Sequence, residues 1–160
     1  MLTAPIHRWS VLMGKLLASF TLGVVCMAIL AISSSLMFGA EWGNPVGVAI
    51  LIIASVMSAT SVGAVVSTYV RSSDQAGNAQ SVIAMTLGAL GGSSFPVALA
   101  GGILQQLSLL TPHAWFLQGI GELQSGGELG DIIAPLAAIL AFGAVFGVIA
   151  VARQERMVQP

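Results

Sequence analysis

Charged residues are scarce in this 160-residue sequence: they make up 7% of it, against 56% hydrophobic residues. A soluble domain carries about 25% charged residues, so a chain this poor in charge has too few to cover a water-facing surface. Its net charge of -1 also provides no basic surface for nucleic acid. The composition therefore indicates an integral membrane protein that has the lipid bilayer as a partner and binds no nucleic acid.

Cysteine and catalytic motifs are lacking as well. Cys26 is the only cysteine, which excludes an intrachain disulfide. Its place inside an apolar run is typical of a small packing residue. The sequence contains no GxxxxGK[ST] phosphate loop, no HExxH and no Cys/His cluster with metal-ligand spacing. We therefore predict no catalytic residue, no metal and no cofactor for this chain.

Four long stretches without charge are present instead, at 16–40, 42–70, 75–121 and 132–152. A membrane-spanning helix needs about 20 apolar residues, and helices satisfy their own backbone polar groups in lipid. The sequence therefore predicts an all-α membrane protein, a single transmembrane domain over 1–160. Its four transmembrane helices are expected at 14–38, 46–70, 77–95 and 132–152.

The basic residues all lie at the ends of these stretches and can be placed on one side of a membrane. Cytoplasmic loops are enriched in Lys and Arg, so that side is predicted to be the cytoplasm, with both termini in it. Four of the six acidic residues then lie outside. The basic residues are Arg8, Lys15, Arg71, Arg153 and Arg156, and the four acidic residues are Glu41, Glu122, Glu128 and Asp131.

The third stretch is long enough for two crossings, but this orientation allows only one. It begins inside, beside Arg71, and it must end outside, at Glu122. An odd number of crossings is therefore required, and one crossing leaves a remainder of apolar sequence.

We expect that crossing, 77–95, to end near Gly91, Gly92 and Pro96, because two glycines and a proline interrupt a helix. The remainder, 97–121, is predicted to be a re-entrant or interfacial helical segment on the outer face. Such segments exist where protein covers the backbone or where it lines a water-filled cavity.

Small residues at four-residue spacing allow close helix packing in lipid. The second stretch has such a row, and its richness in Ser, Thr and Gly favours a helix buried among others. The fourth stretch has Gly143 and Gly147. The row in the second stretch is Ser55, Ala59, Gly63 and Ser67.

Four segments carry a resemblance to a known family. They are LTAPIHRWSVLMGKL at 2–16, GGSSFP at 91–96, LQQLS at 104–108 and TPHAW at 111–115. In this order and spacing they resemble the membrane subunit of the ABC-2 family of ATP-binding-cassette exporters. That family has a stretch reading roughly LxTP(V/I)xRWx(I/L)LxGK, then GGxxxP, LxxLS and PxxW. The resemblance covers essentially the whole chain.

The resemblance implies a multi-pass permease of the plasma (inner) membrane that forms a translocation pathway and catalyses no reaction itself. A separate ABC ATPase subunit would hydrolyse ATP, and a second permease copy would complete the transporter. The coupling segment, 1–12, would dock on the ATPase, with Thr3, Pro5, Arg8 and Trp9 as its candidate residues. The outer hairpin would close the exit of the pathway, with Gly91, Gly92, Pro96, Pro112 and Trp115 as its candidate residues.

Two departures accompany the resemblance. Family members often have a second proline before the LxxLS turn, where this chain has Ala100, Gly101 and Gly102. The family's domain also has six crossings, and this chain resembles the last four, so an N-terminal part is expected to be missing.

Other functions remain open from the residues alone. A membrane scaffold or assembly protein that transports nothing, or a non-functional fragment of a permease, would share the composition. A hydrolase with Ser93 or Ser94 as nucleophile and His113 as base is a further, weaker hypothesis, since no acidic residue is placed to orient the histidine.

Overall fold

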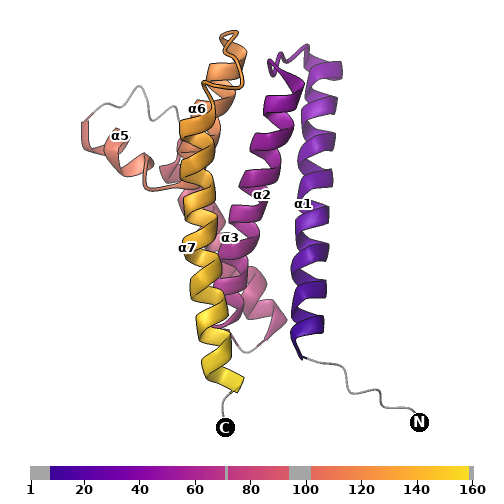
Figure 1. Cartoon of the computed structure of the whole chain (residues 1–160), viewed down its shortest axis with the longest axis vertical. Coiled ribbons are helices and arrows are strands. Elements are labelled where there is room, and N and C mark those ends of the chain that lie inside the picture. The colour runs from indigo at the N-terminus through magenta and orange to yellow at the C-terminus, as the bar shows by residue number, and fades with distance from the viewer. Residues whose placement is uncertain (1–7, 71, 94–101, 159–160) are drawn as a thin grey trace.

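The computed structural model describes residues 8–70, 72–93 and 102–158, and within these ranges every regular element is a helix. The helices form an elongated bundle in which α1 begins and α7 ends at the same end (Figure 1). They are α1 (Arg8–Phe38), α2 (Pro45–Ser67), α3 (Ser73–Leu90), α5 (Gly102–Ser108), α6 (Pro112–Gln124) and α7 (Ile133–Val158). The all-helical prediction is confirmed for the described residues.

The bundle is organised around α2, which packs against α1, α3, α6 and α7. Leu51 of α2 is fully buried, as are Leu123 of α6 and Ile139 of α7. A helix that is apolar on all sides suits such a central position. The structure thus confirms that the second charge-free stretch forms a helix buried among the others.

Local sequence signals start three of the helices. Asn44 caps α2 by accepting hydrogen bonds from the backbone of Val46 and Gly47, at 2.9 and 3.3 Å, and Pro45 follows it in the first turn. Thr111 and Pro112 repeat this arrangement at α6, and Ser72 caps α3. Such side chains satisfy backbone N–H groups that have no partner within the helix, and proline has no N–H to leave unsatisfied there.

After α1 and α2 the chain runs along the bundle a third time, and this third passage is divided between two helices, α3 and α6. In Figure 1, α3 occupies the lower part and α6 the upper part, with α5 extending sideways between them in sequence. α3 and α6 have 18 and 13 residues, together as many as the 31 of α1. Along the bundle, α6 continues the passage that α3 begins. The crossing at 77–95 and the outer re-entrant segment at 97–121 stay predictions.

Three of the described helices are long and apolar enough to cross a membrane, namely Met13–Phe38, Pro45–Ser67 and Ile133–Gln154. These overlap the predicted crossings at 14–38, 46–70 and 132–152. α3 is not one of them, because its first turns contain Asp74, Gln75, Asn78 and Gln80. A fourth crossing therefore stays a prediction, and α3 could make it only together with α6.

Close packing between α2 and α7 uses a different row of small residues from the predicted one. A Cβ built on Gly143 would lie 3.2 Å from Ser58 Cα, and one on Gly147 would lie 3.7 Å from Ser61 Oγ. The prediction of close approach is thus confirmed at Gly143, whereas at Gly147 an added Cβ would make only an ordinary contact. The α2 row that begins at Ser55 faces elsewhere, because the packing row is set by which side of α2 meets α7.

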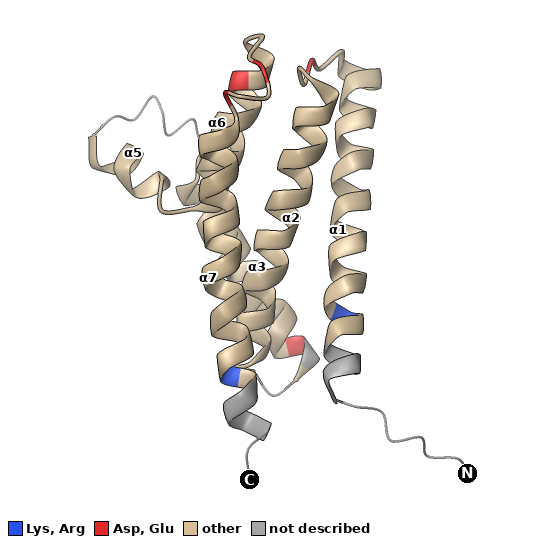
Figure 2. Ribbon diagram, in the orientation of Figure 1, with Lys and Arg blue, Asp and Glu red and all other residues tan. Residues whose placement is uncertain are grey.

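Charged residues gather at the two ends of the bundle (Figure 2). The acidic end holds the α1–α2 loop, the end of α6 and the loop before α7, which contain Glu41, Glu122, Glu128 and Asp131. Lys15, Arg153 and Asp74 lie toward the opposite end. There Arg153 stacks on Tyr69, with Cζ 3.8 Å from the ring centroid, so α7 is fastened to the segment just after α2.

Polar contacts fasten the acidic end as well. Gln124 Nε2 at the end of α6 donates to the Glu41 carbonyl oxygen at 2.9 Å. Trp42 Nε1 donates to Ser34 Oγ at 3.0 Å. Gly43 has φ +81°, and a Cβ on it would overlap the backbone carbonyl of Leu123. The α1–α2 loop and α6 are thus in direct contact.

We predict that Gly43→Ala lowers the melting temperature of the detergent-solubilised protein strongly. It adds backbone strain and an atom for which there is no space. Gly39→Ala is the matched control, because Gly39 also has positive φ, at +64°, but open space around it. That control should cost only about 1–2 kcal/mol of backbone strain. Equal losses in the two variants would contradict the contact between the loop and α6.

Candidate functional site

The last turn of α3 and the first turn of α6 lie side by side at the break in the third passage. A Cβ on Gly91 would overlap His113 Cβ and would lie 2.6 Å from Thr111 Oγ1. Gly91 is in the ordinary right-handed region, with φ -77°, so space rather than backbone freedom requires glycine here. α3 and α6 therefore meet where Gly91, which has no side chain, leaves space for His113 and Thr111; we call this contact the glycine notch.

Most of the predicted outer-hairpin residues are placed around this junction. Gly91 ends α3, and Pro112 lies in the first turn of α6. Gly92 turns the chain with φ +92°. Trp115 Nε1 donates to the Leu109 carbonyl oxygen at 2.8 Å and so ties α6 to the turn before it. Pro96 lies outside the described residues.

A cleft of about 540 Å³ lies beside the junction. Its walls come from α2, α3 and α6, and Met27 of α1 also contributes. Most of the lining is aliphatic or aromatic, including Val62, Leu87 and Phe116. No lining residue is Asp, Glu, Lys or Arg. A mostly apolar cleft with a few polar groups is the usual form of a small-molecule site.

Two polar atoms of the cleft residues stand out, Ser55 Oγ and His113 Nδ1. Both are buried, and neither has a hydrogen-bond partner within the described part of the chain. Neighbouring hydroxyls behave differently: Thr60 Oγ1 donates to Val56 O at 2.7 Å, and Ser61 Oγ donates to Met57 O at 3.0 Å. A buried polar group left unsatisfied costs about 1–3 kcal/mol. Ser58 Oγ, outside the cleft and on the side of α2 that meets α7, is unpartnered in the same way, so this property is not confined to the cleft.

The sequence alone did not indicate Ser55, Met27 or Gln80 as parts of a site. Ser55, Ala59 and Gly63, which form the row of small residues on α2, line the cleft. Gly63 also meets another helix there, since Gln80 Nε2 of α3 donates to its carbonyl oxygen at 3.4 Å. The four-residue spacing was the available signal, since it shows that the residues share a face, but it does not show what that face meets.

Ser93 and His113 lie near one another, as a hydrolase would require. A Cβ on Gly88 would be 3.9 Å from both Ser93 Oγ and His113 Nε2. No hydrogen bond joins the two side chains in the described ranges, and His113 Nδ1 has no partner to orient the ring. An activated nucleophile needs both links, so the pair lacks the geometry for catalysis. Ser94 lies outside the described residues.

The predicted coupling residues are located only in part. Thr3 and Pro5 lie outside the described residues, while Arg8 and Trp9 begin α1. This start of α1 lies at the end of the bundle where α7 finishes (Figure 1). The structure thus places the first turn of α1 at the end of the bundle toward which Lys15 and Arg153 lie, which we call the basic end.

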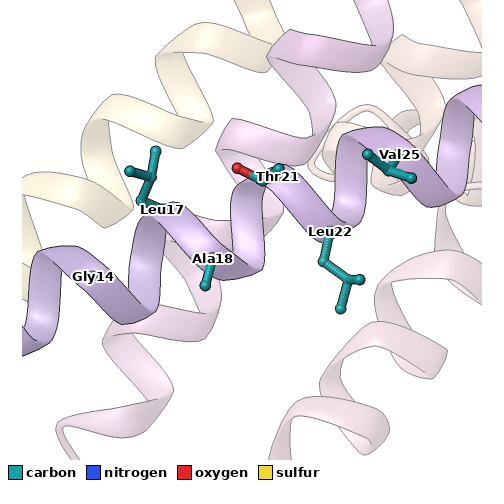
Figure 3. Close-up of a pocket in the computed structure, with 6 residues that line it drawn as sticks. All are labelled: Gly14, Leu17, Ala18, Thr21, Leu22 and Val25. Carbon is teal, nitrogen blue, oxygen red and sulfur yellow. The ribbon is translucent and has the colours of Figure 1, made fainter.

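The outer face of α1 carries a second depression, of about 490 Å³ (Figure 3). Gly14, Leu17, Ala18 and Leu22 line it, all from this one helix and all exposed. It is a strip of helix surface without a second wall.

Among the described residues, no group of three or more His, Cys, Asp or Glu side chains is placed to hold a metal ion.

The fold and the charge distribution define a helical membrane protein with two ends of opposite character. Residues 1–152 match the family described as ABC-2 family transporter protein, and the chain belongs to this family. The comparison confirms the resemblance on which the sequence prediction was based.

One curated relative is the linearmycin resistance permease protein LnrN of Bacillus subtilis (strain 168). The two proteins are 25% identical over 146 residues, which is 91% of this chain and 38% of LnrN. The chain thus spans well under half the length of this relative. No solved structure matches it.

We predict that Gly91→Ala separates α3 from α6, since its methyl group needs the space that His113 and Thr111 occupy. The variant should have a lower melting temperature in detergent than the unsubstituted protein. Gly77→Ala is the matched control in the same helix, where nothing lies within 4 Å and alanine gains up to about 1 kcal/mol of helix propensity. A Gly91→Ala protein as stable as the Gly77→Ala protein would contradict the observed junction.

Proposed function

We propose that this chain is a membrane-spanning part of an ABC-2 type exporter, that it helps to form the translocation pathway, and that a separate ABC ATPase supplies the energy. The family match over residues 1–152 carries this proposal. Three helices that are long and apolar enough to cross a membrane also support it. A second permease copy would complete the assembly.

We further propose that the basic end of the bundle lies in the cytoplasm of the plasma (inner) membrane. The support is the segregation of charge, since Lys15 and Arg153 lie toward one end and four acidic residues lie at the other (Figure 2). Enrichment of Lys and Arg on the cytoplasmic side orients membrane proteins in this way. Both termini would then be cytoplasmic, and the coupling segment 1–12 would face the ATPase.

Four crossings fit this orientation if α3 and α6 share the third. α1, α2 and α7 would each cross alone, because each is long and apolar enough. Broken helices are found in transporters where the interrupted backbone is covered by protein or lines a cavity. The contact between α3 and α6, and the cleft beside it, supply such surroundings here.

The physiological role is proposed from the relative. LnrN is named for linearmycin resistance, so we propose a resistance role for this chain as well. Because the chain spans 38% of that protein, further transmembrane segments of the working permease would come from outside this sequence.

We predict that a cysteine introduced by Glu128→Cys reacts with a membrane-impermeant maleimide added outside intact cells. One introduced by Ser73→Cys should react only after the membrane is opened. Cys26→Ala provides the background, since Cys26 is exposed. The reverse pattern of labelling would overturn the proposed orientation.

We predict that the chain co-purifies with an ABC ATPase and stimulates its ATP hydrolysis. Arg8→Ala and Trp9→Ala should each reduce this stimulation several-fold, because both residues lie in the segment proposed to contact the ATPase. Glu128→Gln is the control, since it changes a charge near the opposite end of the bundle.

Unchanged stimulation and export in the Arg8 and Trp9 variants would refute the coupling assignment. A chain that binds a membrane partner but never an ATPase would instead favour the scaffold hypothesis.

A further inference from the structure

We propose that Arg153 and Tyr69 together bind the phosphate of a lipid headgroup at the basic end of the bundle. The inference goes beyond the proposed function, because it concerns neither the exported substrate nor the ATPase. It rests on one part of that function, namely that α2 and α7 each cross the membrane. It does not depend on which end of the bundle lies in the cytoplasm, since both leaflets have phosphates.

The aromatic ring of Tyr69 holds the Arg153 side chain in place. Arg153 Cζ lies 3.8 Å from the ring centroid, well within the range of a cation–π contact. A guanidinium that stacks on a ring contacts it through one face of its plane, while its N–H groups lie in that plane and point outward. The stack therefore restricts a long side chain without using its hydrogen-bond donors.

The donors of both side chains have no partner in the described part of the chain. No hydrogen bond or ion pair there involves the Arg153 guanidinium or the Tyr69 hydroxyl, and both residues are exposed. Nearby hydroxyls differ, since those of Ser67 and Thr68 each donate to a carbonyl oxygen of the preceding turn, at 2.7 Å. The stacked pair thus presents a charged donor and a neutral donor to its surroundings.

The position of the pair along the bundle is that of lipid headgroups. From Ile133, where α7 begins, to Arg153 the helix is about 30 Å long at 1.5 Å per residue. The hydrocarbon core of a bilayer is about 30 Å thick, so a helix that crosses it from Ile133 leaves the core near Arg153. Tyr69 follows the end of α2 at Ser67. Both side chains therefore lie where the acyl chains end and the phosphates begin.

Phosphate is the group at that depth that matches these donors. The fork of an arginine guanidinium donates two parallel hydrogen bonds to phosphate oxygens, and such charged hydrogen bonds are stronger than neutral ones. The Tyr69 hydroxyl is attached to the ring that Arg153 covers, so it offers a further donor beside the fork. Asp74 also lies toward this end, but it forms no ion pair with Arg153.

Lys15 provides a comparison at the same end of the bundle. It is exposed, and no aromatic ring or carboxylate contacts it in the described ranges. A lysine ammonium is a point charge on a flexible stem, without the planar fork of arginine. It should attract anionic lipids in general without holding one of them, which makes it the matched control for Arg153.

The test measures lipid binding to the purified protein together with the subunits that co-purify with it. Dioleoylphosphatidylglycerol would be titrated in detergent, and the affinity for the first bound lipid would be measured by native mass spectrometry. Dioleoylglycerol has the same acyl chains but no phosphate, and inorganic phosphate has no acyl chains. We expect dioleoylphosphatidylglycerol to bind more tightly than dioleoylglycerol, and inorganic phosphate not to displace it.

Three variants test the residues. Arg153→Gln should weaken binding of dioleoylphosphatidylglycerol about tenfold, which corresponds to about 1.4 kcal/mol. Tyr69→Phe should weaken it several-fold while keeping the ring beneath the guanidinium, so it tests the hydroxyl without removing the stack. Lys15→Gln should leave the affinity for the first lipid unchanged. Binding of dioleoylglycerol should be the same in all three.

Four results would overturn the proposal. Equal affinity for dioleoylphosphatidylglycerol and dioleoylglycerol would show that only the acyl chains are bound. Displacement of the lipid by inorganic phosphate would show a site for soluble phosphate. An equal loss in Lys15→Gln and Arg153→Gln would show a general attraction of the basic end. Unchanged lipid binding in both Arg153→Gln and Tyr69→Phe would show that the pair faces another subunit.

The same preparations separate this inference from the proposed function. Lipid binding requires no ATP, so selective binding without any stimulation of an ATPase would refute the exporter proposal and leave the lipid site standing. ATPase stimulation without selective binding would refute the lipid site alone.

Discussion

The rest of the structure depends on the close packing of α2 against α7. Gly143 allows Ser58 of α2 to approach so closely that no larger side chain fits at that position of α7 without movement. Lipid tails are as apolar as leucine, so helices in a membrane are held by contact area and close approach rather than by the hydrophobic effect. This pair gives α1, α3 and α6 a common surface to pack on. α2 is therefore the helix through which the others are positioned.

The break in the third passage follows from this arrangement and from local sequence. α3 begins with polar residues and ends at Gly91, while Thr111 and Pro112 start α6. Neither helix reaches both ends of the bundle by itself. Their overlap, through the glycine notch that receives His113, restores a continuous column beside α2.

Much of the fold could be predicted from the sequence, and the physical reasons are specific. Lys15 and Arg153 mark where the apolar parts of α1 and α7 end, because charge is costly in the bilayer interior. The helices themselves extend further, to Arg8 and Val158. The same reasoning could not divide the stretch 75–121, which carries no charge to mark where a helix stops. Asp74 and the polar residues after it indicate that α3 is less apolar than its neighbours. The length of the charge-free stretch 75–121 nevertheless favours a full crossing there.

The candidate site was harder to predict than the fold. Ser55, Ala59 and Gly63 were correctly placed on one face of α2, but the sequence does not say which face meets α7, since every side of this helix is apolar. For His113 the sequence offers only the hypothesis of a base for Ser93 or Ser94. Its burial beside Gly91 depends on α3 and α6 meeting at their ends, which is a tertiary contact between segments that the sequence separates by α5.

The two ends of the α2–α7 pair are held differently from the rest of the bundle. Arg153 on Tyr69 fastens one end, and α6 with its contact to the α1–α2 loop braces the other. α1, by contrast, is one uninterrupted helix of 31 residues that touches only α2 extensively. The described helices thus comprise a pair braced at both ends, α2 and α7, one continuous helix, α1, and a column divided in two beside Gly91.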